Sequence, residues 1–205
     1  MKNLPRIVRT AGGFSFLINE EPFIMLAAEA HNSACTSRHY MQNVWKRAKE
    51  LNCNTVLAPV YWELIEPQEH HFEFDSVSQL LSDARSHSMK LVLLWFGSWK
   101  NGHSTYVPNW IKTDLERFPR TEDESGVKTR TLSMFRSDLL TAELNSFTNF
   151  MKFLKESDLD SQTVIAVQVE NEVGILGAAR DFSPGAAEEY RKDVPRALIE
   201  HIEKA

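Results

Sequence analysis

The sequence lacks the features that would place it in a membrane, outside the cell or on nucleic acid. None of its apolar runs approaches the roughly 20 residues that a membrane-spanning helix needs, so no membrane partner is expected. The first ten residues, MKNLPRIVRT, contain no apolar segment of the kind found in secretory signals, which predicts a cytoplasmic protein. The formal net charge is −5, and Lys and Arg are scattered along the chain, which argues against a nucleic-acid partner.

Motifs that bind metals and cofactors are also missing. Cys35 and Cys53 are the only cysteines and match no CxxC pattern, so two reduced, partly buried thiols are expected. No GxGxxG sequence follows any expected strand, which argues against a dinucleotide-binding fold. His70 and His71 lie next to Glu69 without any metal-ligand spacing, and we interpret them as a solvated turn. The sequence therefore predicts neither a cofactor nor a metal.

The sequence does contain a recurring unit, in which an apolar strand is followed by an amphipathic helix. Its 205 residues are 42% hydrophobic and 25% charged, which is typical of one globular domain. Alternating apolar residues followed by the turn residues 19–22 predict a hairpin before the first core strand. Core strands are expected at residues 23–31, 54–62, 90–99 and 163–171. Helices are expected at residues 37–51, from about 75, at about 138–155 and after Pro184 and Pro195. The helix at about 138–155 is expected to bury Leu140, Leu144, Phe147, Met151 and Leu154.

Four strand–helix units in succession predict parallel strands joined by crossover helices, and therefore an α/β fold. An open doubly wound sheet and a barrel both fit this pattern. Polar and aromatic residues gather at the C-terminal strand ends, where a barrel has its active face: Glu29 and His31, Trp62 and Glu63, Trp95 to Lys100, and Glu170 to Glu172. A complete barrel takes about 250 residues. We therefore expect a (β/α)8 TIM-barrel type fold with only the first four β/α units present, preceded by a short β-hairpin. The open edges of such a half barrel predict self-association.

One connection is unusually long. From Gly97 to about Ser137 the sequence shows no strong periodicity, but it contains several aromatic residues. Loops of this length in compact domains are usually functional or disordered. The aromatic content favours an ordered loop that faces a ligand.

The stretch TVIAVQVENEVG, residues 163–174, is the most informative, because its apolar run ends in two carboxylates that flank an amide. Strand alternation predicts one shared face for Ala166, Gln168, Glu170 and Glu172, opposite Ile165, Val167 and Val169. A rim carboxylate shielded by aromatic residues is expected to have a raised pKa, as a proton donor needs. The amide of Asn171 offers a donor and an acceptor to a hydroxyl-rich ligand. The alternative is a pair of carboxylates that only cap the loop after the strand.

The segment VQVENEVG resembles the fourth-strand motif of retaining β-galactosidases in glycoside hydrolase families 35 and 42, which are (β/α)8 barrels. Three other segments resemble the first, second and third strands of these enzymes: AAEAHNSA, NTVLAPVYWELIEPQEHHFEFD, and LVLLWFGSWKNG followed by VPNWI. The likeness spans roughly residues 14–180, and the order of the motifs is its most specific part. Pro59 and Ser98 depart from the family 35 pattern, which has Tyr and Glu there, so those two substrate contacts are not carried over.

The resemblance implies a retaining hydrolase of terminal β-D-galactosides, on an oligosaccharide or a polysaccharide side chain, with residues 1–205 as the N-terminal half of its catalytic domain. Glu172 matches the general acid/base and Asn171 the residue that binds the sugar hydroxyl next to the reacting carbon. The nucleophile, a second Glu, is expected beyond residue 205. Glu170 is expected to support Glu172.

Further candidates for sugar binding lie at the other strand ends. They are Glu29, His31, Trp62, Trp99, Lys100 and Asn101. Trp62, Trp95 and Trp99 are candidates for stacking on a sugar face, with a core position as the alternative for each. For Lys100 and Asn101 the alternative is a surface position, and for Glu29 and His31 it is a buried, mutually satisfied pair.

Two competing hypotheses remain at this point. The first is a truncated, catalytically inactive product that binds sugar or complements a partner supplying the other half. The second is a barrel enzyme outside sugar hydrolysis, such as an isomerase or aldolase, for which Lys100 is the only candidate Schiff-base lysine.

Overall fold

The four apolar strands form one parallel sheet whose strand order follows the sequence. The sheet consists of β4 (Ala27–Glu29), β5 (Thr55–Tyr61), β6 (Lys90–Phe96) and β9 (Val164–Val169), in the order β4-β5-β6-β9. The computed structural model describes residues 4–204, and the predicted parallel α/β fold is confirmed. Each crossover adds the next strand to the same edge, whereas a doubly wound sheet reverses direction at its switch point. No such reversal occurs within the described residues.

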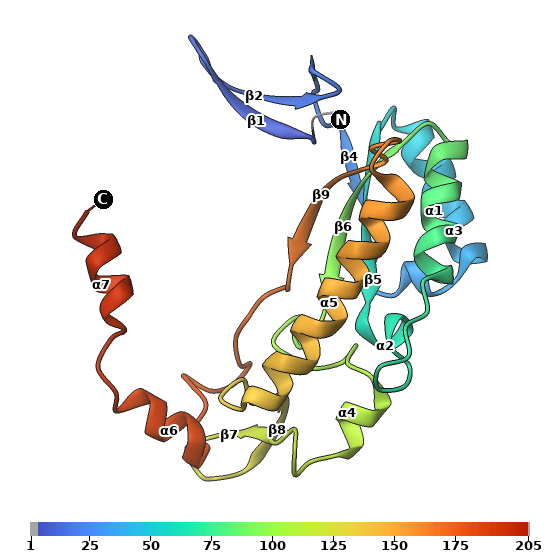
Figure 1. Cartoon of the computed structure of the whole chain (residues 1–205). Helices are drawn as coiled ribbons and strands as arrows, with labels where there is room; N and C mark the ends of the chain where they lie inside the picture. Colours follow the sequence, from blue (N-terminus) through green and yellow to red (C-terminus); the bar gives the residue numbers. More distant parts are fainter. Residues whose placement is uncertain (1–3, 205) are drawn as a thin grey trace.

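Three long helices follow the strands and pack on the same core (Figure 1). They are α1 (Arg38–Glu50), α3 (Asp75–Ser86) and α5 (Ser137–Asp158). Alternate strand residues such as Val56, Ala58 and Leu93 belong to the core cluster that these helices cover. Strand residues of the opposite parity, such as Leu94 and Phe96, form a separate smaller cluster. The sheet therefore has one helix-covered face and one face that is only partly covered within residues 4–204.

The predicted buried face of α5 is correct for Phe147 and Leu154, which belong to or pack on the core, and wrong for Leu140, Leu144 and Met151. Leu140 and Leu144 are 56% and 59% exposed, whereas Leu139 and Phe150 are fully buried. The buried stripe also contains Glu143 and two further polar residues, Ser146 and Asp158. The prediction followed apolarity alone, and it failed because this stripe includes polar side chains that are buried in the core.

The first core strand is shorter than the predicted residues 23–31. Only Ala27–Glu29 pairs with β5. The preceding segment is held by the side chain of Asn54, whose Nδ2 donates to the carbonyl of Ile24 at 2.8 Å and whose Oδ1 accepts from the amide of Leu26 at 2.9 Å. These side-chain bonds replace part of the strand ladder.

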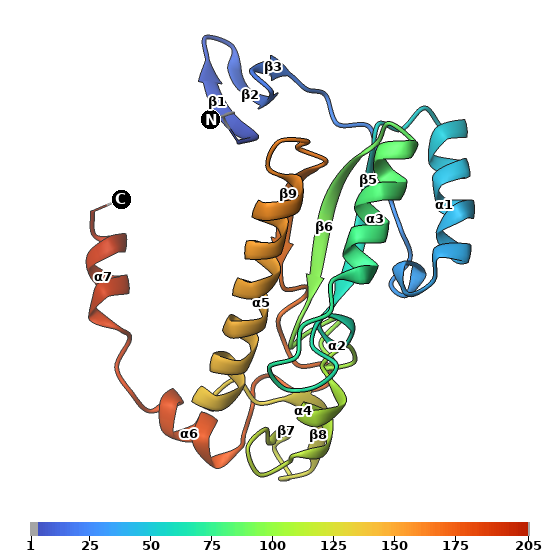
Figure 2. The ribbon, with the colours of Figure 1, turned by 45° about the vertical axis from the view of Figure 1, so that its right-hand side comes forward.

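The N-terminal residues form a small antiparallel sheet away from the main one (Figure 2). It contains β1 (Arg6–Thr10), β2 (Gly13–Ile18) and β3 (Glu21–Pro22). The predicted hairpin is confirmed, because β2 pairs with β3 across Asn19 and Glu20. The pairing of β1 with β2 adds a strand that was not predicted.

The long connection is ordered and lies at the C-terminal ends of the parallel strands (Figure 1). It contains α4 (Asn109–Thr113) and the antiparallel pair β7 (Arg120–Glu122) and β8 (Lys128–Leu132). Asp181, in the segment after β9, accepts from the amide of Glu122 at 3.1 Å and from the hydroxyl of Ser133 at 2.6 Å. These bonds join the connections that follow β6 and β9.

The remaining helices are short. They are the 3-10 turn η1 (Ala34–Thr36), α2 (Trp62–Ile65), α6 (Pro184–Tyr190) and α7 (Arg196–Ile202). Pro184 begins α6 and Pro195 precedes α7, as predicted. Among residues 4–204 no helix combines the length and apolarity needed to cross a bilayer. Both thiols are free and partly buried, as predicted, and burial raises the pKa of Cys35 to about 12.

Candidate active site

Two of the predicted sugar-binding residues meet at the C-terminal ends of β6 and β9. The ammonium of Lys100, from the loop after β6, donates to Oδ1 of Asn171, from the turn after β9, at 2.7 Å. The same ammonium lies 4.7 Å from the centre of the Phe96 ring. Lys100 is only 8% exposed, so a charged side chain is buried between an amide and an aromatic face. Its predicted alternative, a surface position, is thereby excluded.

The strand alternation ends at Val169, before the two carboxylates. Ile165 is buried and Ala166 and Gln168 are exposed, as predicted for opposite faces, but Val169, predicted on the same face as Ile165, is 62% exposed. Glu170 and Glu172, however, have φ angles of 62° and 51°, in the left-handed region that non-glycine residues rarely adopt. The prediction that these two carboxylates continue one strand face is therefore wrong. Such backbone conformations cost on the order of 1–3 kcal/mol each and concentrate at functional sites.

The carboxylate of Glu170 turns toward the loop after β6. It accepts hydrogen bonds from the backbone amides of Ser98 and Trp99, both at 3.0 Å. Since these amides are 71 and 72 positions earlier in the chain, Glu170 joins the two loops that form the site.

A second carboxylate, which the sequence analysis missed, lies against Glu170. Glu143 of α5 is buried, accepts from the indole nitrogen of Trp95 at 3.0 Å, and also accepts from the hydroxyl of Ser98. Burial, followed by the hydrogen bond and negative charge of Glu143, raises the pKa of Glu170 to about 9, although the two amides oppose this shift. In the sequence, Glu143 could have been found only by assigning the buried face of α5 correctly, because it is a single Glu within that face.

Glu172, the predicted proton donor, is exposed on the turn after β9. The shielded environment that we expected for a rim carboxylate is found at Glu170 instead. Asn171, between them, is partly buried and fixed by Lys100. The turn thus leaves Glu172 exposed, next to an Asn171 side chain that is held by Lys100.

The other predicted sugar-binding residues differ in how exposed they are. Glu29 and His31, at the end of β4, are both exposed, so a buried pair is excluded. Trp99 is partly buried, and its indole nitrogen is enclosed without a hydrogen-bond partner among the described residues. Asn101 is exposed in the turn after Lys100.

The prediction that Trp62 stacks on a sugar face is wrong. This side chain is fully buried, donates to Glu66 at 2.9 Å and packs edge-on against Trp110. A fully buried ring has no face left for a sugar, so Trp62 belongs to the core. Trp95 is also fully buried, beneath Phe150.

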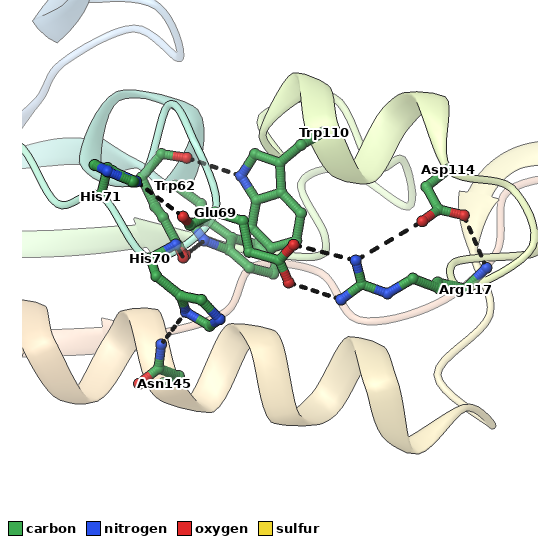
Figure 3. Close-up of polar contacts among 9 residues, drawn as sticks. Trp62, Glu69, His70, His71, Trp110, Asp114, Arg117 and Asn145 are labelled. Atoms are coloured by element: carbon green, nitrogen blue, oxygen red, sulfur yellow. Dashed lines mark hydrogen bonds and ion pairs between the residues drawn. The ribbon is translucent and has the colours of Figure 1, made fainter.

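The turn that contains His70 and His71 anchors the long connection (Figure 3). Both imidazoles are exposed, which confirms the predicted solvated turn. Arg117 forms a bidentate ion pair with Glu69 at 2.7 and 3.1 Å, and Trp110 donates to the carbonyl of Glu66 at 3.1 Å. Within residues 4–204 no group of three His, Cys, Asp or Glu side chains is placed to hold a metal ion.

Comparison with known proteins matches residues 15–203 to the family model described as glycosyl hydrolases family 35. A β-galactosidase of Xanthomonas manihotis is 25% identical over 169 residues, which are 79% of this chain and 26% of that protein. Among solved structures, the exo-β-1,4-mannosidase Op5Man5 from Opitutaceae bacterium strain TAV5 superposes with a TM-score of 0.53 at 16% identity. That match covers 82% of this chain and 27% of the mannosidase, and at this identity it supports the fold alone. The chain spans about a quarter of the length of either relative.

Proposed function

Because the chain belongs to glycosyl hydrolase family 35, we propose that it contributes to a retaining glycosidase that hydrolyses terminal β-D-galactosides. The observation that carries this proposal is the Asn171–Glu172 pair at the end of β9, with the Asn171 amide fixed by the buried ammonium of Lys100. The name of the β-galactosidase relative supports the choice of sugar.

In the proposed mechanism Glu172 is the general acid/base. It protonates the glycosidic oxygen while a second Glu, about 5–5.5 Å away, attacks the anomeric carbon and forms a glycosyl-enzyme intermediate. Glu172 then takes a proton from the incoming water, whose oxygen displaces the enzyme carboxylate with net retention. The exposure of Glu172 supports this role, because the proton donor must reach both the leaving group and water.

Glu170 is a poor candidate for the nucleophile. Its two oxygens accept from the amides of Ser98 and Trp99, and its raised pKa favours the neutral form, which is a weak nucleophile. We therefore propose that the nucleophile lies in a part of the enzyme outside residues 1–205. The share of the β-galactosidase relative that the chain covers, 26%, supports this.

We further propose that residues 1–205 are the N-terminal half of a (β/α)8 catalytic domain and supply its first four β/α units. The sequential order of β4, β5, β6 and β9 supports this, because a barrel wall is built in this way. The exposed residues Ala166 and Gln168 would then face the barrel interior.

Within that barrel we propose Asn171, Lys100 and Asn101 as hydrogen-bonding partners of sugar hydroxyls and Trp99 as a stacking platform. The place of Trp99 in the loop after β6, next to Lys100 and only partly buried, supports this role. Glu29 and His31 remain candidates at the neighbouring strand end, where both are exposed.

Turnover of a chromogenic β-galactoside tests the proposal, with the 205-residue chain and a form extended through the remaining barrel strands assayed side by side. We expect Glu172→Gln to lower kcat by at least a hundredfold in whichever form is active. The matched control, Glu124→Gln on an exposed turn, should leave kcat unchanged. An active Glu172→Gln variant would show that another residue is the acid/base.

A second candidate function is a catalytically inactive fragment that binds sugar or complements a partner chain. An apolar hollow of about 400 Å³ beside β9, lined in part by Met151, Leu154 and Val167, favours it, because a further strand–helix unit would cover such a surface. An inert 205-residue chain that gains activity on mixing with the remaining half of the barrel would establish this function.

A further inference from the structure

The contact between Glu143 and Glu170 is unusual because two carboxyl groups are buried against each other. Glu143 enters from the middle of α5, and Glu170 begins the turn after β9. One oxygen of each, Glu143 Oε1 and Glu170 Oε1, lies close to the same point beside Gly97, and at such a separation a proton on one of the two carboxyls removes their repulsion. The peptide at Gly97 makes room for this contact. A Cβ there would lie 2.7 Å from Glu170 Oε1 and still closer to Glu143 Oε1.

Four donors from the described residues surround the pair. Trp95 and the Ser98 hydroxyl donate to Glu143, while the amides of Ser98 and Trp99 donate to Glu170. These four donors stabilise a single buried charge, as buried carboxylates require. Two charges at this distance would repel each other in a poorly solvated site.

We propose that Glu143 and Glu170 are positioning residues that share one proton, and that this pair fixes the loop after β6 to the turn that carries Asn171 and Glu172. The inference rests on the proposed function for its catalytic consequence, but the shared proton stands independently of it. The coupling is direct: the loop that contains Ser98 also contains Lys100, which holds Asn171. Loss of the shared proton should therefore loosen both sides of the site together.

The charged groups around the pair define what a titration would report. Within the described part of α5, Glu143 is the titratable group that acts on Glu170. The loop after β6 contributes the ammonium of Lys100, which is directed to Asn171, and the turn after β9 contributes the exposed carboxylate of Glu172.

The first test needs no enzymatic activity. Carboxyl-labelled glutamate is followed by ¹³C NMR in the 205-residue chain between pH 5 and 10, in wild type, Glu143→Gln, Glu170→Gln and the control Glu124→Gln. We expect one carboxyl to titrate near pH 9 in wild type and in the control. Both pair variants should lose it, because an amide then donates in place of the shared proton. A wild-type chain in which every glutamate titrates below pH 6 would overturn the proposal.

The second test measures β-galactoside hydrolysis by the intact enzyme. We expect Glu143→Ala to lower kcat at least tenfold with less than a threefold change in KM, Glu143→Gln to restore most of the rate, and the alkaline limb of the rate profile to move in the Gln variant. An unchanged kcat and pH profile in Glu143→Ala would refute the positioning role. An inert wild-type enzyme that still shows the alkaline titration would refute the proposed function and support the shared proton.

Discussion

Replacement of Gly97 by Ala should be one of the most damaging single-methyl changes in this protein. A Cβ at this position would lie 2.5 Å from the indole nitrogen of Trp95 and 2.7 Å from Glu170 Oε1, and would overlap Glu143 Oε1. Relief by a small rotation is blocked, because Glu143 is bonded to both Trp95 and Ser98 and Trp95 is fully buried. The methyl group therefore forces the buried carboxyl pair apart or displaces the β6 loop.

The expected cost combines two effects. Overpacking of a dense site typically costs about 1–3 kcal/mol, and a buried hydrogen-bonding group that loses its partner costs about 1–3 kcal/mol. Since the two effects share the same atoms, we expect a total of about 3 kcal/mol. With a urea m-value of about 2 kcal/mol/M, the unfolding midpoint should fall by about 1.5 M.

Urea unfolding of the 205-residue chain near pH 6 measures this cost, and two comparisons identify its cause. Gly12→Ala is the matched control, because a Cβ at Gly12 meets nothing within 4 Å. In a Glu143→Ala background the closest of the three clashes is gone while those with Trp95 and Glu170 remain, so Gly97→Ala should there cost less than in wild type, but not nothing. A Gly97→Ala variant with the wild-type midpoint would refute the packing that we describe around the carboxyl pair.

Four further outcomes are expected. Between about pH 5 and pH 9 the free energy of unfolding should fall by up to about 1.4 kcal/mol per pH unit. The reason is that folded Glu170 keeps its proton to about pH 9, whereas the unfolded chain releases it near 4.5. Urea unfolding at several pH values measures this dependence, and a free energy that does not change with pH would contradict it. Asp158→Ala should cost about 2 kcal/mol in thermal unfolding, since Asp158 is buried and accepts from the amide of Val164 at 2.7 Å and from Arg85 at 2.6 Å, and a loss below about 1 kcal/mol would contradict this. Lys100→Met should weaken galactose binding about tenfold by calorimetry, because Asn171 loses a charged donor, and unchanged affinity would exclude this role for the ammonium. Light scattering of the isolated chain should show a mass that rises with concentration, and a monomer at all concentrations would count against an open half barrel.

The parallel sheet was predictable because its strands carry their own signal. The apolar runs at residues 54–62 and 90–99 became β5 and β6, and the period of about 3.6 located the helices that follow. Parallel strands are buried on both faces, so their composition depends little on which neighbour they pair with. For the same reason, the alternating order of strands and helices in the sequence was sufficient to predict the parallel α/β fold class.

The details of the site were less accessible, because they depend on contacts between distant residues. The shortening of the first strand comes from Asn54, about 30 positions away from the segment that it holds. The rotation of α5 brings Glu143 inward to meet Trp95 and Ser98, and no periodicity of apolar residues indicates a buried carboxylate. The left-handed backbone at Glu170 likewise breaks the alternation at the point where the sequence motif begins.

The geometry of the proposed proton donor therefore depends on residues that the motif does not contain. Three sets of hydrogen bonds join the loop after β6 to its surroundings. Glu170 accepts from the amides of Ser98 and Trp99, and Glu143 accepts from the Ser98 hydroxyl. The third is the bond from Lys100 to Asn171. Each crosses between elements at least 45 positions apart. Because all three involve one short loop, a change at any of them should be transmitted to the turn that presents Glu172. A chain that keeps the Asn-Glu motif but loses Glu143 or Gly97 should therefore fold as the same sheet and position its acid poorly.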